Sequence, residues 1–384
     1  MVNIKISHNE RINEVDLFKS IPDNPYLLLT PGPLSTSKSV RAAMLFDLCT
    51  WDEDYTRLTQ RIRKRLVNLS TNKPENYTCV LMQGSGTFCI EAVLGSIISK
   101  ENKLLILANG AYGRRMVEIS RRLELNYLVN DGSEIKPPDL LLLKETLEND
   151  KEITHVAFVH CETTTGILNP LEEIMEIAKK YNKKVIVDAM SSFGGIEIDV
   201  EELGIDFLVS SSNKCIEGVP GFGFIIADIE ELKKTKGNSK SLSLDIYDQW
   251  AEMEAKGKWR FTSPTHVVRA FYQALLKLEI DGGIRARFYR YSDNQKLLLA
   301  GMKEMGFKCP VPEEFQSPII TSFFYPESSF FSFDKFYFEL KNNGFVIYPG
   351  KISDMDSFRI GNIGRIFAKD IDNLLNLIRL IRFW

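Results

Sequence analysis

Three groups of residues with anion-binding or reactive chemistry follow short apolar runs that are predicted to be β-strands. The tetrapeptide Gly84–Thr87 follows one run, Asp188 ends a second, and Lys214 comes shortly after a third. Because the carboxyl ends of parallel strands meet at one edge of an open sheet, where ligands bind, we expect these groups to lie close together. An anion cradle, a carboxylate and a primary amine in one place could bind a phosphorylated cofactor and attack its carbonyl group.

The tetrapeptide Gly84-Ser85-Gly86-Thr87 leads directly into an apolar helical run that starts at Phe88. Small residues at the N-terminus of a helix allow backbone N–H groups and two hydroxyls to surround a phosphate, which the helix dipole also attracts. A helix start that is merely capped by Ser85 would have the same sequence. The tetrapeptide is neither a GxGxxG nor a Walker motif, so it gives little support to nucleotide binding.

Asp188 and Lys214 each have a simple alternative role when they are considered alone. Asp188 could cap the next helix, and Lys214 could be a solvated surface lysine. Together with the cradle, however, they meet the needs of pyridoxal phosphate (PLP), whose phosphate must be anchored, whose aldehyde binds a lysine amine, and whose pyridine nitrogen is kept protonated by a carboxylate. Partial desolvation beside other cations would lower the pKa of the lysine and favour its neutral, nucleophilic form.

The pattern along the chain predicts an α/β domain over roughly residues 40 to 280. Continuous apolar runs of this length are typical of strands buried on both faces of a parallel sheet. A helix lies between two of them: we expect Asn169 to cap it and Pro170 to occupy its first position, ahead of an apolar stripe. Strand, helix and strand at this spacing form a βαβ unit. The predicted strands are 80–83, 104–107, 156–160, 185–188, 207–210 and 222–227.

The pattern changes after Asp281-Gly282-Gly283. A helix over 284–305 precedes fewer strands and two covering helices, which predicts a small α+β domain. We therefore divide the chain into an N-terminal extension (1–24), a large cofactor-binding α/β domain (25–283, with an arm at 25–40 near the active site) and a small C-terminal domain (284–384). The predicted elements of the small domain are strands 319–325, 345–348 and 357–360 and helices 333–341 and 370–382.

Composition excludes several classes of protein. The 384 residues are 44% hydrophobic and carry a net charge of −3, so neither nucleic acid nor an anionic membrane would be bound by overall charge. No apolar run approaches the roughly 18 residues of a membrane span, and the N-terminus lacks a secretory pattern, which predicts a cytoplasmic protein. Six scattered cysteines without a CxxC pair are typical of reduced thiols. Four histidines without ligand spacing indicate no zinc site, and we predict no metal.

The motifs of the chain, taken together, resemble those of the class V aminotransferases, which are PLP enzymes of fold type I. The resemblance extends in family order from about residue 25 to the end, which makes it far more specific than any one motif. The segments that carry it are LLLTPGPLSTS (27–37), QGSGT (83–87), NGAYGRRMVE (109–118), HCETTTGILNP (160–170), VDAMSSFGGI (187–196), SSNKCIEGVPGFGF (211–224), GKWRFTSPTH (257–266) and FRIGNIG (358–364).

The resemblance implies a role for each matching residue. Lys214 would form the Schiff base with PLP, and Asp188 would pair with the pyridine nitrogen, so these two are the predicted catalytic residues. Tyr112 would stack on the cofactor ring, and Thr163 would lie on the side of its hydroxyl group. The phosphate and its surroundings would be bound by Ser85, Gly86, Thr87 and Asn213.

Substrate and partner roles are implied in the same way. Arg359 would bind the acid group of the substrate, since a guanidinium suits carboxylate and phosphonate oxygens alike. A surface arginine that pairs with a nearby acid is the simple alternative. Gly32, in the TPGP turn, would line the site near the substrate, or would only form a rigid turn. Thr262 would reach the phosphate of a partner subunit, which implies a homodimer with the active site at its interface.

The activity implied by the resemblance is transfer of the amino group of 2-aminoethylphosphonate to pyruvate, which gives phosphonoacetaldehyde and L-alanine in a ping-pong reaction. An alanine:glyoxylate or serine:pyruvate transaminase of the same class is an alternative. A cysteine desulfurase would need a reactive cysteine, for which Cys309 is the only candidate. A phosphate-binding scaffold without catalytic activity is an alternative from a different class.

Overall fold

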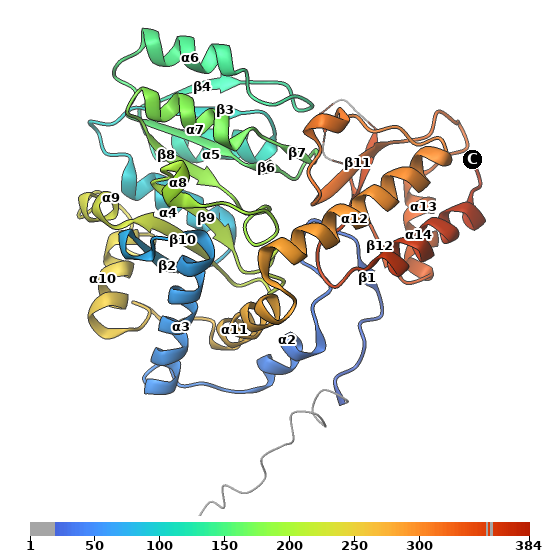
Figure 1. Ribbon diagram of the computed structural model, residues 1–384, viewed down its shortest axis with the longest axis horizontal. Helices are drawn as coiled ribbons and strands as arrows, with labels where there is room; N and C mark the ends of the chain where they lie inside the picture. Colours follow the sequence, from blue (N-terminus) through green and yellow to red (C-terminus); the bar gives the residue numbers. More distant parts are fainter. Residues whose placement is uncertain (1–19, 351, 354–355) are drawn as a thin grey trace, which may run out of the picture.

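A seven-stranded sheet forms the centre of the larger lobe (Figure 1) in the computed structural model, which describes residues 20–350, 352–353 and 356–384. The predicted extension 1–24 therefore lies mostly outside the described residues. The strand order is β2-β10-β9-β8-β5-β3-β4. The strands are β2 (Tyr77–Gln83), β3 (Leu104–Ala108), β4 (Tyr127–Asp131), β5 (His155–Val159), β8 (Lys184–Asp188), β9 (Phe207–Ser211) and β10 (Phe222–Asp228).

Six of these strands run in the same direction, and β10 is antiparallel to both of its neighbours, β2 and β9. The mostly parallel sheet is thus confirmed, and the carboxyl ends of β2, β8 and β9 meet at one edge as expected. The reversal of β10 could not be read from its sequence, because a strand covered on both faces is apolar whichever way it runs. Strand β4 was not predicted, since it is half-buried at the edge of the sheet and ends in Asn130 and Asp131.

Helices cover both faces of this sheet and form an α/β/α sandwich. One core lies between the sheet and α3, α6, α7 and α11, and the other lies between the sheet and α4, α5 and α9. The helices of this lobe are α2 (Lys38–Ala42), α3 (Glu53–Ser70), α4 (Gly86–Ile97), α5 (Ala111–Arg122), α6 (Leu140–Asn149), α7 (Leu171–Lys180), α8 (Val200–Leu203), α9 (Ile229–Lys234), α10 (Ile246–Lys256) and α11 (Thr265–Ile280).

The helix predicted after Asn169 is α7, but the prediction of its cap was wrong. Pro170 is the N-cap residue, and no side chain caps the helix. The Asn169 side chain instead donates to the backbone oxygen of Val159 at 2.7 Å and exchanges hydrogen bonds with Asn109. Asn169 therefore joins the ends of two strands, because its buried amide finds stronger partners there than at the helix terminus.

The smaller lobe lies at the right of Figure 1 and contains a three-stranded sheet of order β11-β14-β13. Its strands are β11 (Ile320–Phe324), β13 (Tyr348–Pro349) and β14 (Ser357–Gly361), and its helices are α13 (Phe333–Asn342) and α14 (Ala368–Ile381). Aromatic rings around Phe358 fill the core, where Phe307, Phe323 and Phe336 contact its ring. The long helix α12 (Gly283–Glu304) extends from the larger lobe to this one.

The predicted strand 345–348 is divided between two sheets. Residues Phe345–Val346 form β12, which pairs in parallel with β1 (Leu27–Leu28), whereas Tyr348 belongs to β13. The arm 25–40 thus supplies a strand to the smaller lobe, although we assigned it to the large domain. Short two-stranded pairings of this kind depend on contacts between distant segments, which periodicity does not report.

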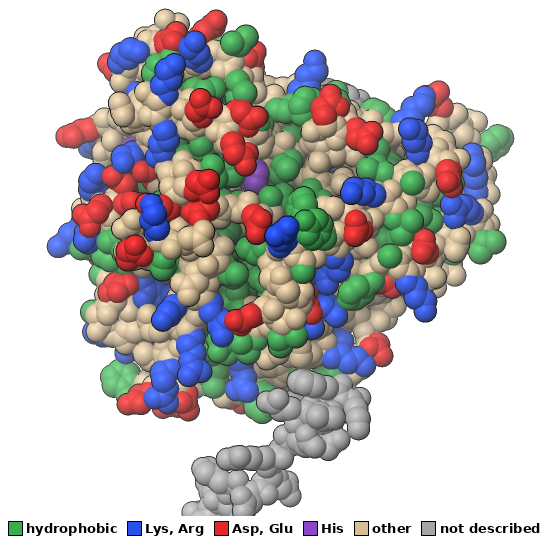
Figure 2. Space-filling model, in the orientation of Figure 1, with side chains coloured by type: hydrophobic (Ala, Val, Ile, Leu, Met, Phe, Trp, Pro, Cys, Tyr) green, Lys and Arg blue, Asp and Glu red, His purple; other side chains and the backbone are tan. Residues whose placement is uncertain are grey.

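The surface carries both charge signs without a large region of one sign on the face shown in Figure 2, where Lys and Arg side chains alternate with Asp and Glu. This pattern agrees with the net charge of −3. Within the described residues, no helix combines the length and the apolar character that crossing a bilayer requires.

Candidate active site

A cavity of about 730 Å³, including its open mouth, lies at the carboxyl edge of the large sheet. The cavity brings together most of the residues that were predicted from the sequence. Arg359 lies just outside its lining, where its guanidinium donates to the backbone oxygen of Thr163, and Thr262 is exposed to solvent elsewhere on the chain. The predicted residues that line the cavity are Gly32, Ser85, Gly86, Thr87, Tyr112, Thr163, Asp188, Asn213 and Lys214.

The N-terminus of α4 is open toward the cavity. Ser85 is the N-cap residue, but its hydroxyl accepts no hydrogen bond from the first turn of the helix. The alternative of a helix merely capped by Ser85 is therefore wrong. A Cβ on Gly86 would lie 2.4 Å from the sulfur of Met190, so a side chain at this position would require Met190 to move. Free N–H groups, the hydroxyls of Ser85 and Thr87 and the helix dipole make this turn suitable for a phosphate.

Asp188 is a buried carboxylate at the end of β8, with 5% of its surface exposed. Its Oδ1 accepts the N–H of Met190 at 2.9 Å, and its other oxygen accepts no hydrogen bond from the described residues. The alternative of a helix cap is wrong, because turns follow β8 and α8 begins only at Val200. Burial raises the pKa of Asp188 to about 7, and the nearby Glu162 carboxyl adds to the rise. A cation placed against the free oxygen would relieve this cost.

Lys214 is half-buried and points back toward the N-terminal arm. Its Nζ donates to the backbone oxygen of Pro31 at 2.6 Å, and within the described residues it forms no ion pair. Gly32 lies against its stem, since a Cβ there would be 3.0 Å from Cδ of Lys214. Burial lowers the pKa of the lysine, and the charge of Arg359 lowers it further while Asp188 acts in the opposite direction. The arrangement favours a neutral amine.

Arg359 lies on β14, with 3% of its surface exposed. Its Nε donates to the oxygen of Pro349 at 3.0 Å and its Nη1 to the oxygen of Thr163 at 2.7 Å. Among the described residues, no carboxylate lies within ion-pair distance of this guanidinium, so the predicted alternative of a surface ion pair finds no support there. Burial lowers its pKa. A buried cation that is held only by neutral carbonyl groups is suited to an anionic ligand.

Among the residues that were not singled out from the sequence, Arg115 lines the cavity and Glu162 lies beside α5. Arg115 lies on α5 one turn after Tyr112, lines the cavity, and donates to the hydroxyl of Thr87 at 3.0 Å. Its guanidinium carbon lies 4.6 Å from the centre of the Tyr112 ring. The helical spacing from Tyr112 to Arg115 could have indicated a shared face. Glu162 is fully buried beside α5, and no periodicity in the sequence indicates its position.

Cys309, the candidate nucleophile for a desulfurase, does not line the cavity. It lies between α12 and β11 and packs against the aromatic core of the smaller lobe. Burial raises the pKa of its thiol to about 11, so the reactive thiolate is scarce near neutral pH. Cys309 thus has the environment of a structural cysteine.

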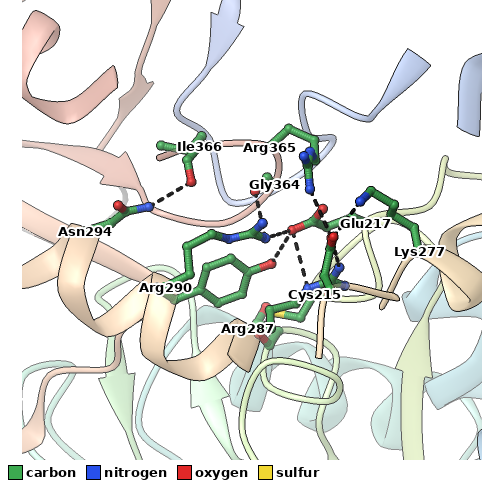
Figure 3. A network of polar contacts seen from close by, with 12 residues as sticks. Cys215, Glu217, Lys277, Arg287, Arg290, Asn294, Gly364, Arg365 and Ile366 are labelled. Atoms are coloured by element: carbon green, nitrogen blue, oxygen red, sulfur yellow. Dashed lines mark hydrogen bonds and ion pairs between the residues drawn. The ribbon is translucent and has the colours of Figure 1, made fainter. Parts of the chain in front are cut away.

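The turn that carries Lys214 is fastened to α12 by a buried carboxylate, Glu217 (Figure 3). The backbone N–H of Glu217 donates to the oxygen of Lys214 at 2.7 Å, which closes the turn. Its side chain forms an ion pair with Arg290 and accepts the hydroxyl of Tyr291 at 2.8 Å. Arg287, with 2% of its surface exposed, donates to the oxygen of Cys215 at 2.7 Å and lies 3.6 Å from the Glu217 carboxylate.

The same network reaches the segment that follows Arg359. Arg290 donates to the oxygen of Gly364 at 3.2 Å, and Asn294 donates to the oxygen of Ile366 at 3.0 Å. One face of α12 therefore holds both the turn after Lys214 and the chain that leaves β14. The relative positions of the amine and the guanidinium depend on this helix.

Comparison with known proteins identifies the family. The family model described as aminotransferase class V matches residues 42–280. The chain is 60% identical over 357 residues to a 2-aminoethylphosphonate–pyruvate transaminase of Bacillus mycoides strain KBAB4, which covers 93% of this chain and 98% of the relative. The chain belongs to the class V aminotransferases.

Solved structures of aminotransferases confirm the predicted fold. An alanine–glyoxylate aminotransferase from Nostoc sp. superimposes with a TM-score of 0.85 at 23% identity, over 94% of this chain and 96% of that one. A pyridoxamine–pyruvate aminotransferase from Mesorhizobium loti gives a TM-score of 0.84 at 23% identity, over 94% and 93% of the two chains. At such low identity these likenesses establish the fold of this class V aminotransferase and leave its substrate open.

We predict that Asp188 makes the stability of the cofactor-free protein depend on pH. Its pKa of about 7 in the fold exceeds its ordinary value of 3.8, so folding favours the protonated form, and stability falls as the pH rises between these values. Asp188→Asn removes this loss, and its gain in unfolding free energy over the parent protein should grow by up to about 1.4 kcal/mol per pH unit in that window. Urea unfolding of both proteins at pH 5 and 7.5 measures the change, and an equal difference at the two pH values would contradict the prediction.

We also predict that Glu217→Ala destabilises the protein strongly. The substitution removes the carboxylate that faces the half-buried Arg290 and the buried Arg287, and leaves Arg287 only Asp281 at 3.8 Å. Breaking a buried ion pair in this way costs about 3–5 kcal/mol. Glu327→Ala is the control, because Glu327 pairs with Lys308 at an exposed site where such a pair contributes about 0–1 kcal/mol. Thermal and urea unfolding compare the two variants, and a loss in Glu217→Ala no larger than that of the control would refute the assignment.

Proposed function

We propose that the protein transfers the amino group of 2-aminoethylphosphonate to pyruvate, with PLP as its cofactor, and produces phosphonoacetaldehyde and L-alanine. The observation that carries this proposal is one cavity edge that combines an unpaired amine (Lys214), a buried carboxylate (Asp188) and a buried guanidinium without an acidic partner (Arg359). The name of the relative that is 60% identical over 93% of the chain supports the choice of substrate.

The residues at the cavity fit PLP. The first turn of α4 offers the phosphate its N–H groups, the hydroxyl of Ser85, which caps no N–H group of the helix, and the hydroxyl of Thr87, to which Arg115 donates. Asp188 offers a free oxygen to the pyridine nitrogen. Tyr112 lines the same cavity and would cover one face of the ring, with Thr163 on the side of its hydroxyl group and Asn213 near the phosphate. When bound, the cofactor supplies an aldehyde that reacts with amines and a ring that accepts the electron pair of a broken C–H bond.

Lys214 would act as the base and the acid of the reaction. Its lowered pKa provides a neutral amine, which can accept the proton from the substrate carbon next to nitrogen and return it after the amino group has moved. The backbone oxygen of Pro31, to which Nζ donates, holds the amine at the cavity. Because this oxygen is uncharged, it favours the protonated amine less than a carboxylate would. Asp188 would hold a proton on the ring nitrogen, because a buried carboxylate gains most from a cation at its free oxygen.

Arg359 would bind the acid group of each substrate in turn. Its guanidinium presents a planar fork of donors that matches the oxygens of a phosphonate as well as those of a carboxylate. The donor brings the phosphonate, and pyruvate and alanine bring the carboxylate, so one residue serves both halves of a ping-pong reaction. The carbonyl groups of Pro349 and Thr163 fix the guanidinium in place, which lowers the ordering cost of substrate binding.

The visible spectrum tests the cofactor and the lysine together. We expect the purified protein to gain an absorbance band above that of free PLP when PLP is added, and borohydride to abolish this band and leave the label bound to Lys214. Lys214→Ala should show neither the fixed label nor turnover. A parent protein without such a band would support a phosphate-binding scaffold, and turnover by Lys214→Ala would refute the role of the lysine.

A panel of amino donors then tests the substrate. With pyruvate as acceptor, we expect alanine to form from 2-aminoethylphosphonate faster than from serine, and Arg359→Ala to lose most of kcat/KM for both the phosphonate and pyruvate. Arg379→Ala is the control, since Arg379 is exposed on α14 and pairs with Glu304 at the surface. Activity with serine or with alanine and glyoxylate, but none with the phosphonate, would instead favour the other transaminases of this class.

We further infer that two copies of the chain complete each active site. Thr262 is exposed and does not line the cavity of its own chain. Its neighbour Phe261 and the distant Trp51 are exposed aromatic residues. Trp51 packs against Lys258, which leads into the segment of Thr262. An apolar exposed surface beside a polar candidate ligand is suited to contact with a second copy.

Mixing of variants tests this dimer. Thr262→Arg should bind PLP weakly and Lys214→Ala should be inactive, but a mixture of the two should regain activity, because one site of the hybrid would combine a native Lys214 with a native Thr262. Sedimentation should show a dimer for each variant. A monomeric parent, or a mixture no more active than its components, would refute the proposal.

A further inference from the structure

Helix α5, which carries Tyr112 and Arg115 to the cavity, has no cap from its own segment. Gly110 is its N-cap residue and offers no side chain. Oε2 of Glu162, from the separate strand β6 (Cys161–Glu162), accepts the backbone N–H groups of Tyr112 at 3.0 Å and Gly113 at 3.3 Å. A residue 50 positions away along the chain thus replaces the usual local cap.

The second oxygen of Glu162 is also occupied. Oε1 accepts the hydroxyl of Thr164 at 2.6 Å and its backbone N–H at 3.4 Å. Gly110 allows this approach, because a Cβ there would lie 2.2 Å from Cγ of Glu162. The carboxylate is therefore enclosed between the start of α5 and the turn after β6, with no measurable exposure to solvent.

Burial raises the pKa of Glu162, and its hydrogen bonds act in the opposite direction. Three of its four hydrogen bonds come from backbone N–H groups, which can only donate and therefore favour the carboxylate form. Within the described residues, no Lys or Arg forms an ion pair with it, so the N–H groups and the positive end of the α5 dipole are what stabilise the carboxylate. Burying a carboxylate without a counterion costs free energy. We therefore expect Glu162 to have a role that its hydrogen-bond geometry explains.

We propose that Glu162 is a positioning residue that fixes the first turn of α5 and thereby places Tyr112 and Arg115 at the cofactor cavity. The effect is passed on to the phosphate cradle, because Arg115 lies over the Tyr112 ring and donates to the hydroxyl of Thr87 at the start of α4. A shift of the first turn of α5 would therefore move the stacking ring and one hydroxyl of the cradle together. This inference rests on the proposed cofactor site and adds a residue that touches neither cofactor nor substrate.

The test compares Glu162→Ala with a cap at a remote helix. Asp139 caps α6 by accepting the N–H groups of Leu141 and Leu142, and α6 lies beside β4 at the far edge of the sheet (Figure 1). We expect Glu162→Ala to speed amide exchange of the peptide around Tyr112 and Gly113 in the cofactor-free protein, and to weaken PLP binding by roughly tenfold or more, since it removes hydrogen bonds to a buried charge. Asp139→Ala should lower Tm without weakening PLP binding.

Glu162→Gln is a second variant, which tests the inference if Glu162→Ala does not fold. Its amide has one acceptor oxygen, so it can satisfy one side of the carboxylate and should weaken PLP binding less than alanine does. PLP binding as tight as in the parent for both Glu162 variants, or an equal loss in Asp139→Ala, would overturn the inference. A parent protein that binds no PLP would instead overturn the proposed function. The capping role can be tested without the cofactor, because unchanged amide exchange at Tyr112 and Gly113 in the variants would contradict it.

Discussion

Two basic groups at one cavity edge, the amine of Lys214 and the guanidinium of Arg359, stand without a neutralising acid, and the rest of this structure depends on this constraint. Burial lowers the pKa of Lys214 and the charge of Arg359 adds to this, and the described residues provide no carboxylate in ion-pair contact with either side chain. Such an arrangement costs free energy in the absence of a ligand. The surrounding chain must therefore hold both groups in place by other means.

Neutral carbonyl groups and remote carboxylates provide those means. Pro31 accepts from the lysine, and Pro349 and Thr163 accept from the arginine, so each side chain is oriented by uncharged oxygens and stays available to a ligand. The two carboxylates that support the site, Glu217 and Glu162, contact neighbouring segments and not the amine of Lys214 or the guanidinium of Arg359. Glu217 binds the arginines of α12 and fixes the turn after the lysine, while Glu162 binds backbone N–H groups of α5. Glu217 and Glu162 thus stabilise the elements around the site, and Lys214 and Arg359 form no ion pair within the described residues.

Much of this site could be predicted from the sequence, because its residues follow strands whose periodicity is strong. Asp188 is the last residue of β8 and Lys214 lies three residues beyond the end of β9, at the edge where the general rule for parallel sheets places ligand-binding residues. The support for these residues could not be predicted, since it comes from distant segments. The pairing of β1 with β12, the reversal of β10 and the role of Asn169 each depend on contacts that no local pattern records.

The contrast between Glu162 and Glu217 shows why buried carboxylates are the hardest part of such a site to find. Both are fully enclosed, but Glu217 faces two guanidinium groups, whereas Glu162 faces N–H groups and a hydroxyl alone. In the sequence each is one acid among 51 acidic residues. Their common feature appears only in the folded chain. Glu162 holds the first turn of α5, which carries Tyr112, and Glu217 holds the turn that carries Lys214. A chain with a nearly balanced charge can therefore present an amine and a guanidinium without acidic partners, because these two acids bind the segments around the site and not the reactive groups themselves.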